Sequence, residues 1–425
     1  MSRYPCLDRC FDLEASSTLE QLYGDDYRAS LPRFETLLDL FDAQFDGEPE
    51  FLFSAPGRTE IGGNHTDHEN GIVLAGSVNL DVIAAVRPNG SNVIRIQSQG
   101  FPIDVIDLRE LEPVASEKNT SAALIRGIAA RFHQLGYEIG GLDAYTTSGV
   151  LKGSGLSSSA AFEVLVGTIL SHVFNGGKVD AVEIAKIGKY AENEFFGKPS
   201  GLLDQMASSV GGAVYIDFAD PAEPKVEPLR FDFGSCGHAL CIIDSGADHA
   251  DLTHEYAAVP EELRRVCGVF GKTVLREVPK ADFLARLPEV RKAAGDRGAL
   301  RAFHIYADND RVVAERAALI SGDFKRFLTL VRESGRSSFM YLQNVVPTGA
   351  TARQEVALAL ALCDELLGDL GAFRVHGGGF AGTVQAFVPE EMLLCFKQKV
   401  EAVLGADSCY VLRIRPLGGA KIARL

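Results

Sequence analysis

A run of small residues over Leu151–Glu163 (LKGSGLSSSAAFE) is the first segment whose residue types suggest chemistry. Its glycines permit a positive φ, so successive backbone amides can converge on one point. The helix that we expect next, over 159–174, adds unpaired N–H groups and the positive end of its dipole. This pattern indicates a phosphate site, with a plain turn before a helix as the alternative. The GxxxxGK[ST] order of the common P-loop is absent, so amides, serine hydroxyls and a metal ion would have to hold the phosphate.

Polar side chains gather in a second glycine-rich segment, Ala55–Gly71 (APGRTEIGGNHTDHENG). Asp67 can accept hydrogen bonds from sugar hydroxyls, and Arg58 can neutralise a nearby carboxylate or phosphate. We therefore expect a polyhydroxyl ligand at this segment. A metal site made of His65, Asp67 and His68 is a weaker alternative, because adjacent loop residues rarely all face one ion. A solvated loop with capping side chains is the other alternative.

A third segment, Ala191–Ser209 (AENEFFGKPSGLLDQMASS), contributes the carboxylates Glu192 and Asp204. Taken singly, Glu192 fits a solvated helix position and Asp204 fits a helix cap. Combined with the serine loop, one carboxylate could hold Mg²⁺ while the other orients a nucleophilic hydroxyl. A further glycine-rich turn, Val375–Thr383 (VHGGGFAGT), could bring backbone close to the same ligand, or could simply connect two strands.

The order and content of these segments resemble the GHMP small-molecule kinases, which include galactokinase, homoserine kinase, mevalonate kinase and phosphomevalonate kinase. Within that family the galactokinases match best, because APGRTEIGGNHTDHENG resembles their sugar signature and GLLDQ carries the expected aspartate. LKGSGLSSSAAFE resembles the phosphate loop, VHGGGFAGT the third motif, and THEYAAVPEELRRV the segment with a sugar-contacting tyrosine. The resemblance runs from about residue 50 to the C-terminus, and three ordered motifs are far more specific than one.

This resemblance implies an ATP-dependent sugar 1-kinase that uses Mg²⁺ and phosphorylates the anomeric hydroxyl of galactose. Galacturonate or another related hexose is the alternative substrate. A non-catalytic sensor of sugar and ATP is less favoured, because Arg58, Asp204, Glu192 and the serine run are all present. A kinase of the same fold acting on mevalonate or homoserine is disfavoured by the polar cluster at His65 and Asp67.

The resemblance also implies a role for each matching residue. Asp204 would be the catalytic base and Arg58 its partner, and sugar contacts would come from Asn64, His65, Asp67, Gly201 and Tyr256. The phosphate cradle would comprise Gly153, Ser154, Gly155, Leu156, Ser157, Ser158, Ser159 and Ala160. Ser158 or Ser159 would ligate Mg²⁺ with Glu192, and the third motif would use Gly377, Gly378 and Gly379.

The chain departs from the galactokinase pattern at several positions. Asn64 stands where a glutamate associated with the sugar 6-hydroxyl is common, and His68 stands where a tyrosine is usual. An amide can donate as well as accept hydrogen bonds, so Asn64 would tolerate a uronic acid. We therefore expect Asn64 to weaken or broaden selection at C6. His376 and Ala381 also differ from the frequent residues of the third motif, and nothing in the sequence explains these two changes.

The elements that must position these residues read as mixed α+β, with no internal repeat. EFLFSAPGR predicts a strand that enters a Pro-Gly turn, and helices are expected over 121–132 and in the long C-terminal half. The resemblance implies a two-domain GHMP-kinase fold with an N-terminal mixed α/β domain, a C-terminal α+β domain and the active site in the cleft between them. We expect a helical extension at 1–48, the N-terminal domain at 49–235 and the C-terminal domain at 236–425.

Composition excludes several other classes of protein. The 425-residue chain carries a formal net charge of −15, which leaves no basic surplus for nucleic acid. No run of about 18 apolar residues predicts a membrane-spanning helix, and the N-terminus lacks the pattern of a signal peptide. The eight cysteines form no metal-binding pattern and suggest reduced thiols. We expect a cytoplasmic monomer or weak homodimer whose partners are a small sugar and ATP.

Overall fold

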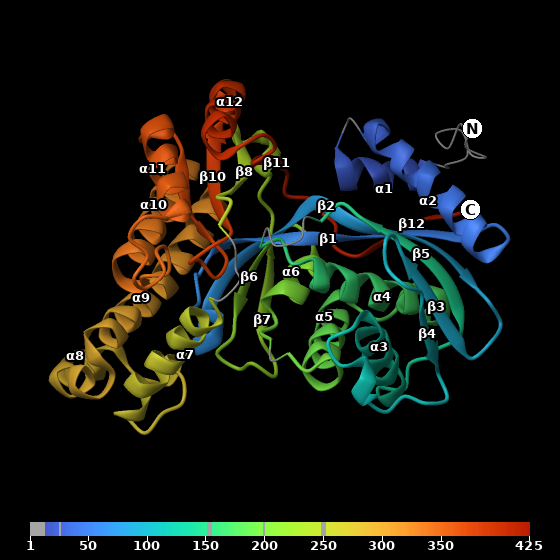
Figure 1. Ribbon diagram of the computed structural model, residues 1–425, viewed down its shortest axis with the longest axis horizontal. Helices are drawn as coiled ribbons and strands as arrows, with labels where there is room; N and C mark the ends of the chain where they lie inside the picture. The colour runs from blue at the N-terminus through green and yellow to red at the C-terminus, as the bar shows by residue number, and fades with distance from the viewer. Residues whose placement is uncertain (1–12, 25–26, 151–154, 199, 248–251) are drawn as a thin grey trace.

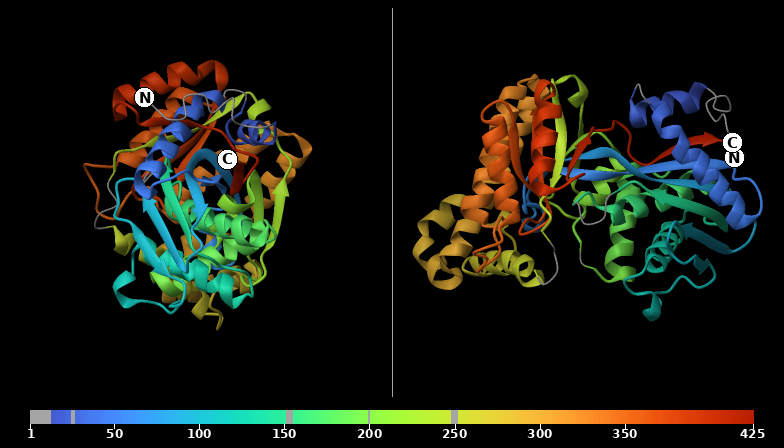
Figure 2. Two further views of the ribbon diagram at one scale, coloured as in Figure 1. Left: turned by 90° about the vertical axis from the view of Figure 1, so that its right-hand side faces the viewer. Right: turned by 45° about the horizontal axis from the view of Figure 1, so that its top comes forward.

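The computed structural model describes residues 13–24, 27–150, 155–198, 200–247 and 252–425. Two bodies lie next to each other in Figure 1, and the long strands β1 and β2 run from the first toward the second. Figure 2 shows the same division from a second direction, with the helices α9–α11 of the second body away from both termini. Gly153 and Ser154 of the expected phosphate cradle lie outside the described residues.

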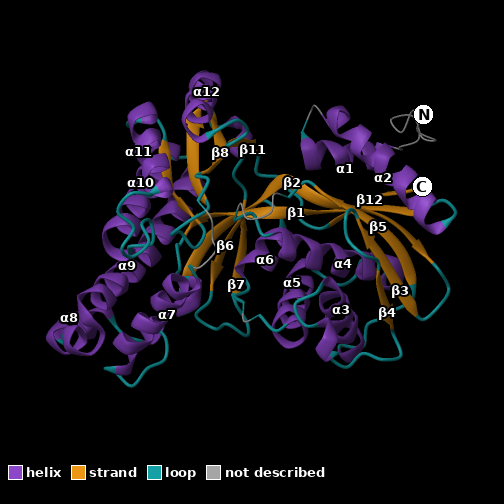
Figure 3. Ribbon diagram, in the orientation of Figure 1, coloured by secondary structure: helices purple, strands orange, loops and turns teal. Residues whose placement is uncertain are grey.

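Helices and strands alternate along the chain, as Figure 3 shows. The helices are α1 (Leu13–Tyr23), α2 (Leu31–Phe45), α3 (Ser121–Gln134), α4 (Ser158–Asn175), α5 (Ala181–Tyr190), α6 (Leu203–Val210), α7 (Thr253–Gly268), α8 (Lys280–Ala285), α9 (Leu287–Ser321), α10 (Phe324–Ser337), α11 (Glu355–Leu367) and α12 (Leu393–Leu404). The strands are β1 (Phe51–Gly62), β2 (Ile72–Pro88), β3 (Val93–Ser98), β4 (Asp104–Asp107), β5 (Leu142–Ser148), β6 (Ala213–Asp217), β7 (Lys225–Leu229), β8 (His238–Asp244), β9 (Ala372–His376), β10 (Thr383–Pro389), β11 (Cys409–Leu412) and β12 (Ala420–Arg424).

The strands of the described residues form an eight-stranded and a four-stranded sheet. The larger sheet has the order β12-β1-β2-β5-β3-β4, with β6 paired to β2 and β7 paired to β6. The smaller sheet has the antiparallel order β11-β8-β10-β9. Because β12 pairs with β1, the end of the chain returns to the first body after the second body has been built. The expected division at 235 and 236 stays a prediction.

Side-chain alternation along the strands explains why helices cover both faces of the larger sheet. Phe53 and Val82 pack into the core that contains α4, whereas Leu52 and Ile83 pack with α1 and α2. In the smaller sheet, Val384 belongs to the core with α11 and α12, and its neighbours on the other face pack against α10. Each sheet is therefore buried between two helical layers.

The strand β1 does not end at the Pro-Gly turn expected from the sequence. It continues through Pro56 and Gly57 to Gly62, with a register shift against β2 between Pro56 and Arg58. A Cβ on Gly57 would lie 2.8 Å from the backbone oxygen of Leu156, so the strand passes close to the serine loop at this glycine. Pairing with β2 along most of β1 overrides the local tendency of Pro-Gly to form a turn.

The N-terminal helices are joined to the sheet by a buried carboxylate, Asp81 on β2. Its oxygens accept hydrogen bonds from Tyr23 (2.5 Å) and Ser54 (2.5 Å) and from the guanidinium groups of Arg33 (2.8 Å) and Arg415 (3.2 Å). Burial alone would raise the pKa of Asp81, but the two arginines and the hydroxyl donors hold it below its usual value. The network therefore ties both N-terminal helices to β1, β2 and the segment before β12.

No helix among the described residues is long and apolar enough to span a bilayer.

Candidate active site

A polar cavity of about 240 Å³ opens where the end of β1, the start of α6 and the third motif come together. Its lining draws on the segments Ala55–Gly71, Ala191–Ser209 and Val375–Thr383, and it includes no described residue of the serine loop. The lining residues are Arg58, Glu60, His65, Asp67, His68, Glu192, Lys198, Ser200, Gly201, Leu203, Asp204, Gln205, Gly377 and Gly378. Segments more than 300 residues apart in the sequence thus share one wall.

Asp204 lies at the start of α6, and two groups bond its carboxylate. Arg58 Nε donates to Oδ1 at 2.6 Å, and the Ser157 hydroxyl donates to Oδ2 at 2.7 Å. Burial favours a raised pKa for Asp204, but the charge of Arg58 and these hydrogen bonds outweigh it and lower the pKa below its usual value. The carboxylate is 35% exposed, so an ionised and oriented acceptor faces the cavity.

The described part of the phosphate loop meets the same arginine. Arg58 donates through its backbone N–H to the Leu156 oxygen (2.9 Å) and through Nη1 to the Gly155 oxygen. Ser157 has a φ of 55°, and α4 begins at the next residue. Ser158 and Ser159 are half-buried in its first turn and Ala160 is buried, although none of the three lines the cavity. The free N–H groups of this turn can bind an anion beside Arg58.

His65 and Asp67 reach the cavity because the chain turns sharply after β1. His65 has a φ of 63°, and its Nε2 donates to the Gly378 oxygen at 2.9 Å. Burial lowers the pKa of His65 to about 4, with the neighbouring His68 adding to the effect. The imidazole is therefore neutral near pH 7. Asp67 lies across from Gly201, where a Cβ would be 2.9 Å from Asp67 Oδ2.

Asn64 does not line the cavity, contrary to the contact expected from the sequence. Its side chain is fully buried, and Nδ2 donates to Glu60 Oε1 (3.0 Å) and to the Gly377 oxygen (2.7 Å). Its Oδ1 accepts from Ser338 (3.2 Å) and Asn344 (2.8 Å). Because protein groups use every donor and acceptor of the amide, this side chain has nothing left to offer a ligand.

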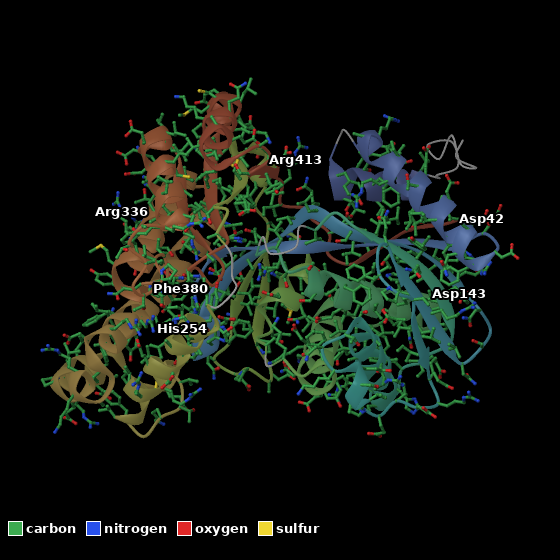
Figure 4. The ribbon with its side chains drawn as sticks, in the orientation of Figure 1. Asp42, Asp143, His254, Arg336, Phe380 and Arg413 are labelled. Atoms are coloured by element: carbon green, nitrogen blue, oxygen red, sulfur yellow. The ribbon has the colours of Figure 1, made fainter. Side chains whose placement is uncertain are left out.

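Tyr256 also contacts the third motif and does not line the cavity. It lies on α7, and its hydroxyl donates to the Gly379 oxygen at 2.8 Å. Phe380, labelled in Figure 4, packs edge-on against the Tyr256 ring with the centroids 5.5 Å apart. The sequence correctly grouped Tyr256 with the site segments, but in this structure its hydroxyl supports backbone.

The third motif supplies three carbonyl groups that hold the site together. The oxygens of Gly377, Gly378 and Gly379 accept from Asn64, His65 and Tyr256, respectively. Its second residue, His376, bonds Thr59 on β1 (Nε2, 3.1 Å) and Thr383 on β10 (Nδ1, 2.9 Å). The glycine-rich turn thus joins the smaller sheet to the sugar segment.

Glu192 lies on a single π turn, Ala191–Phe196, that extends α5. It is buried rather than solvated, and its oxygens accept from Lys198 Nζ (3.0 Å) and Gln205 Nε2 (2.8 Å). The described residues hold no group of three or more His, Cys, Asp or Glu side chains that would enclose a metal. Mg²⁺ keeps several waters and binds substrate phosphates rather than a full protein cage, so a single carboxylate such as Glu192 fits it.

Six cavity residues escaped the sequence reasoning, namely Glu60, His68 as a wall residue, Lys198, Ser200, Leu203 and Gln205. Lys198 stands out because it is a cation in the cavity wall, paired with Glu192. It lies in GKPSG, six residues before Asp204, so its nearness to an assigned carboxylate was the available signal. Gln205 directly follows Asp204 and bridges Glu192 to Glu163, with 2.8 and 2.9 Å contacts.

Two segments match models of known families. Residues 39–88 match the galactokinase galactose-binding signature, and residues 123–212 match the N-terminal domain of GHMP kinases. The chain thus carries a galactokinase signature and a GHMP-kinase N-terminal domain. It is therefore a galactokinase-like phosphotransferase with an alcohol group as acceptor, as the motifs indicated. GHMP kinases use ATP as the phosphoryl donor, generally with Mg²⁺.

Solved structures share the fold of this chain. Galactokinase from Lactococcus lactis, complexed with galactose, matches with a TM-score of 0.77 and 24% identity, covering 92% of this chain and 100% of that one. Mevalonate kinase from Methanococcus jannaschii matches with a TM-score of 0.58 and 14% identity, covering 86% of this chain and 98% of that one. These likenesses confirm the two-domain α+β fold expected from the motifs.

Proposed function

We propose that this GHMP kinase transfers the γ-phosphoryl group of ATP to the anomeric hydroxyl of galactose. The observation that carries the proposal is the Arg58–Asp204–Ser157 cluster. It joins the end of β1, the serine loop and α6 at a cavity whose other wall carries His65 and Asp67. Phosphate-binding and hydroxyl-binding groups therefore meet at one ionised carboxylate, as a sugar kinase requires.

In this proposal Asp204 orients the anomeric hydroxyl and accepts its proton late in the transfer. The transition state of phosphoryl transfer is loose, so positioning and electrostatics lower most of the barrier. Arg58 keeps Asp204 ionised, and its bonds to the serine loop also put its charge beside the phosphate side of the site. Sugar hydroxyls would be held by Asp67 and His65.

In the part of the site that would bind the ATP phosphates, we assign Glu192 with Ser158 or Ser159 as the Mg²⁺ ligands. When bound, Mg²⁺ neutralises charge on the phosphates. Lys198 is the second cation of the wall, and its 59% exposure leaves it able to turn from Glu192 toward a phosphate. The amides at the start of α4 receive the remaining phosphate oxygens.

A coupled ADP-release assay with ATP and Mg²⁺ tests the function across galactose, galacturonate, fucose, glucosamine, mevalonate and homoserine. We expect galactose to give the highest kcat/KM, and phosphorus NMR of the product to show a sugar 1-phosphate. Absence of ADP release with every acceptor would contradict the kinase proposal and favour the sensor alternative. A product phosphorylated at another hydroxyl would contradict the assigned position.

The division at residues 48/49 and 235/236 remains part of the proposal. Size-exclusion chromatography with light scattering would test the expected monomer or weak homodimer. The cytoplasmic location expected from the sequence also stays a prediction.

A further inference from the structure

Glu60 is a carboxylate in the cavity wall to which the proposed reaction gives no role. It lies on β1 two residues after Arg58, and its side chain is 11% exposed. Both of its side-chain bonds fall on Oε1, which accepts from Arg374 Nη2 at 2.5 Å and from Asn64 Nδ2 at 3.0 Å. No described residue bonds Oε2, so this oxygen is the one available to a ligand in the cavity.

Arg374 fixes both the charge and the direction of Glu60. The Arg374 side chain on β9 has no exposed surface, and it also donates to the oxygens of Ile61 (2.9 Å) and Val375 (3.1 Å). A guanidinium stays protonated, and burying it is unfavourable unless a carboxylate compensates its charge. Glu60 is the carboxylate in contact with it, so the ion pair fixes Glu60 in one position. Burial raises the pKa of Glu60, and the charge of Arg374 opposes this shift and favours the ionised form.

Near Glu60 and Asp67 the cavity wall offers mainly hydrogen-bond acceptors, because the cations of the wall are paired with other carboxylates. Arg58 is paired with Asp204, and Lys198 is paired with Glu192. The Asp67 carboxylate lies 4.0 Å from the imidazole of His68, and it also interacts electrostatically with Arg58. Ionised carboxylates accept hydrogen bonds from hydroxyls and repel another carboxylate. Glu60 and Asp67 together therefore suit a neutral polyol and oppose a sugar acid.

On the basis of the proposed function, we propose that Glu60, and not Asn64, selects the sugar in this kinase. Glu60 Oε2 accepts a hydroxyl of a neutral hexose, and its charge excludes hexuronic acids. Asn64 and Arg374 are positioning residues: they do not line the cavity, and they donate hydrogen bonds to Glu60 Oε1. The amide at position 64 thus acts on the substrate through Glu60, and it does not open the site to galacturonate.

Two substitutions at Glu60 separate the hydrogen bond from the charge. Glu60→Gln removes the charge, and we expect kcat/KM for galactose to fall about 10- to 100-fold while galacturonate gains relative to galactose by about tenfold or more. Glu60→Asp keeps a negative charge near Arg374, but its shorter side chain places the carboxylate farther from the ligand. We expect it to weaken galactose use while galacturonate stays excluded. Glu194→Gln, at an exposed position on the same π turn as Glu192, is the matched control and should behave as wild type.

Asn64→Ala tests the positioning role. We expect it to raise KM for galactose while kcat and KM for ATP stay near wild type, because the phosphate side is untouched. A merely structural role would lower the melting temperature without this split between sugar and ATP. Melting curves of all four variants establish that each is folded.

Calorimetric binding of galactose and galacturonate, without ATP, separates this inference from the proposed function. Weaker galactose binding in Glu60→Gln supports the inference even if no sugar is phosphorylated, an outcome that would contradict only the kinase proposal. Equal use or binding of galacturonate and galactose by the wild type would overturn the inference. Folded Glu60→Gln and Glu60→Asp variants with unchanged preference would also overturn it and leave the kinase proposal intact.

Discussion

Asp204 owes its proposed role to its two bonded neighbours. A buried carboxylate by itself gains protons more readily, yet Arg58 and Ser157 reverse that tendency and lower its pKa. Both neighbours come from segments other than that of Asp204, since Arg58 lies on β1 and Ser157 precedes α4. The residue type alone therefore predicts a base, while its protonation state depends on the neighbours.

The substitution Asp204→Asn tests this residue. It keeps the size of the side chain and its bond to Ser157 but removes the proton acceptor, so we expect kcat to fall by about 10³-fold or more. The ADP-release assay measures the loss, and the melting curve checks that the fold is retained. Near-normal turnover in a folded variant would contradict the assignment of Asp204 as the base.

At the scale of elements, glycine-rich turns let backbone segments approach the site. The loop before α6 passes Asp67 at Gly201, and the third motif brings three carbonyl oxygens to Asn64, His65 and Tyr256. A side chain at Gly379 would lie 2.0 Å from the Asn344 oxygen, and its φ of 79° also favours glycine. These turns position side chains that lie on other elements.

Gly201→Ala should misplace Asp67, because the added Cβ would lie 2.9 Å from Asp67 Oδ2. We expect KM for the sugar to rise about tenfold with a smaller change in KM for ATP, since displaced contacts weaken binding and alignment. Steady-state kinetics with each substrate varied in turn measure both constants. Gly268→Ala, at the end of α7 with no atom within 4 Å of the new Cβ, is the matched control. Equal effects of the two substitutions would refute the positioning argument.

At the scale of the whole molecule, buried polar contacts join the sugar segment to the second body. The backbone N–H of Asn64 donates to the Asp308 carboxylate on α9 (2.8 Å), and the backbone oxygen of Asn64 accepts from His304 Nε2 (3.0 Å). Glu69 Oε2 accepts from the backbone of Leu275, just after α7, at 2.7 Å. The sugar segment is consequently fixed by residues from both halves of the chain.

Glu69 makes this junction sensitive to pH. Burial raises the pKa of Glu69 to about 7, against the lowering effect of the Leu275 N–H. A carboxyl whose folded-state pKa is raised stabilises the fold at low pH and loses that contribution as pH rises through the folded pKa. Glu69→Gln mimics the protonated acid. As pH rises from 5 to 8, we expect the free energy of unfolding of the wild type to fall by about 2–3 kcal/mol relative to that of Glu69→Gln.

Denaturant unfolding at several pH values measures this difference. Glu112→Gln, at an exposed glutamate, serves as the control and should follow the wild type. If the stability difference between wild type and Glu69→Gln does not change from pH 5 to pH 8, the raised pKa is wrong.

The sequence by itself determined the family, the order of the motifs and the residues in which chemistry is concentrated. Glycines, serines and carboxylates have local geometric and chemical preferences, so LKGSGLSSSAAFE and APGRTEIGGNHTDHENG indicated phosphate and sugar groups before any fold was known. The helix expected over 159–174 is close to α4, which spans Ser158–Asn175, because helical periodicity is also a local property.

Only the tertiary structure decided which side chains face the cavity. Asn64 and Glu60 are four residues apart, and composition or spacing could not show that the amide is buried while the carboxylate lines the wall. That difference depends on Arg374, Asn344 and Gly377, all from the other end of the chain. Long-range packing sets burial and hydrogen-bond partners, so the proposal that Glu60 rather than Asn64 selects the sugar required the assembled fold.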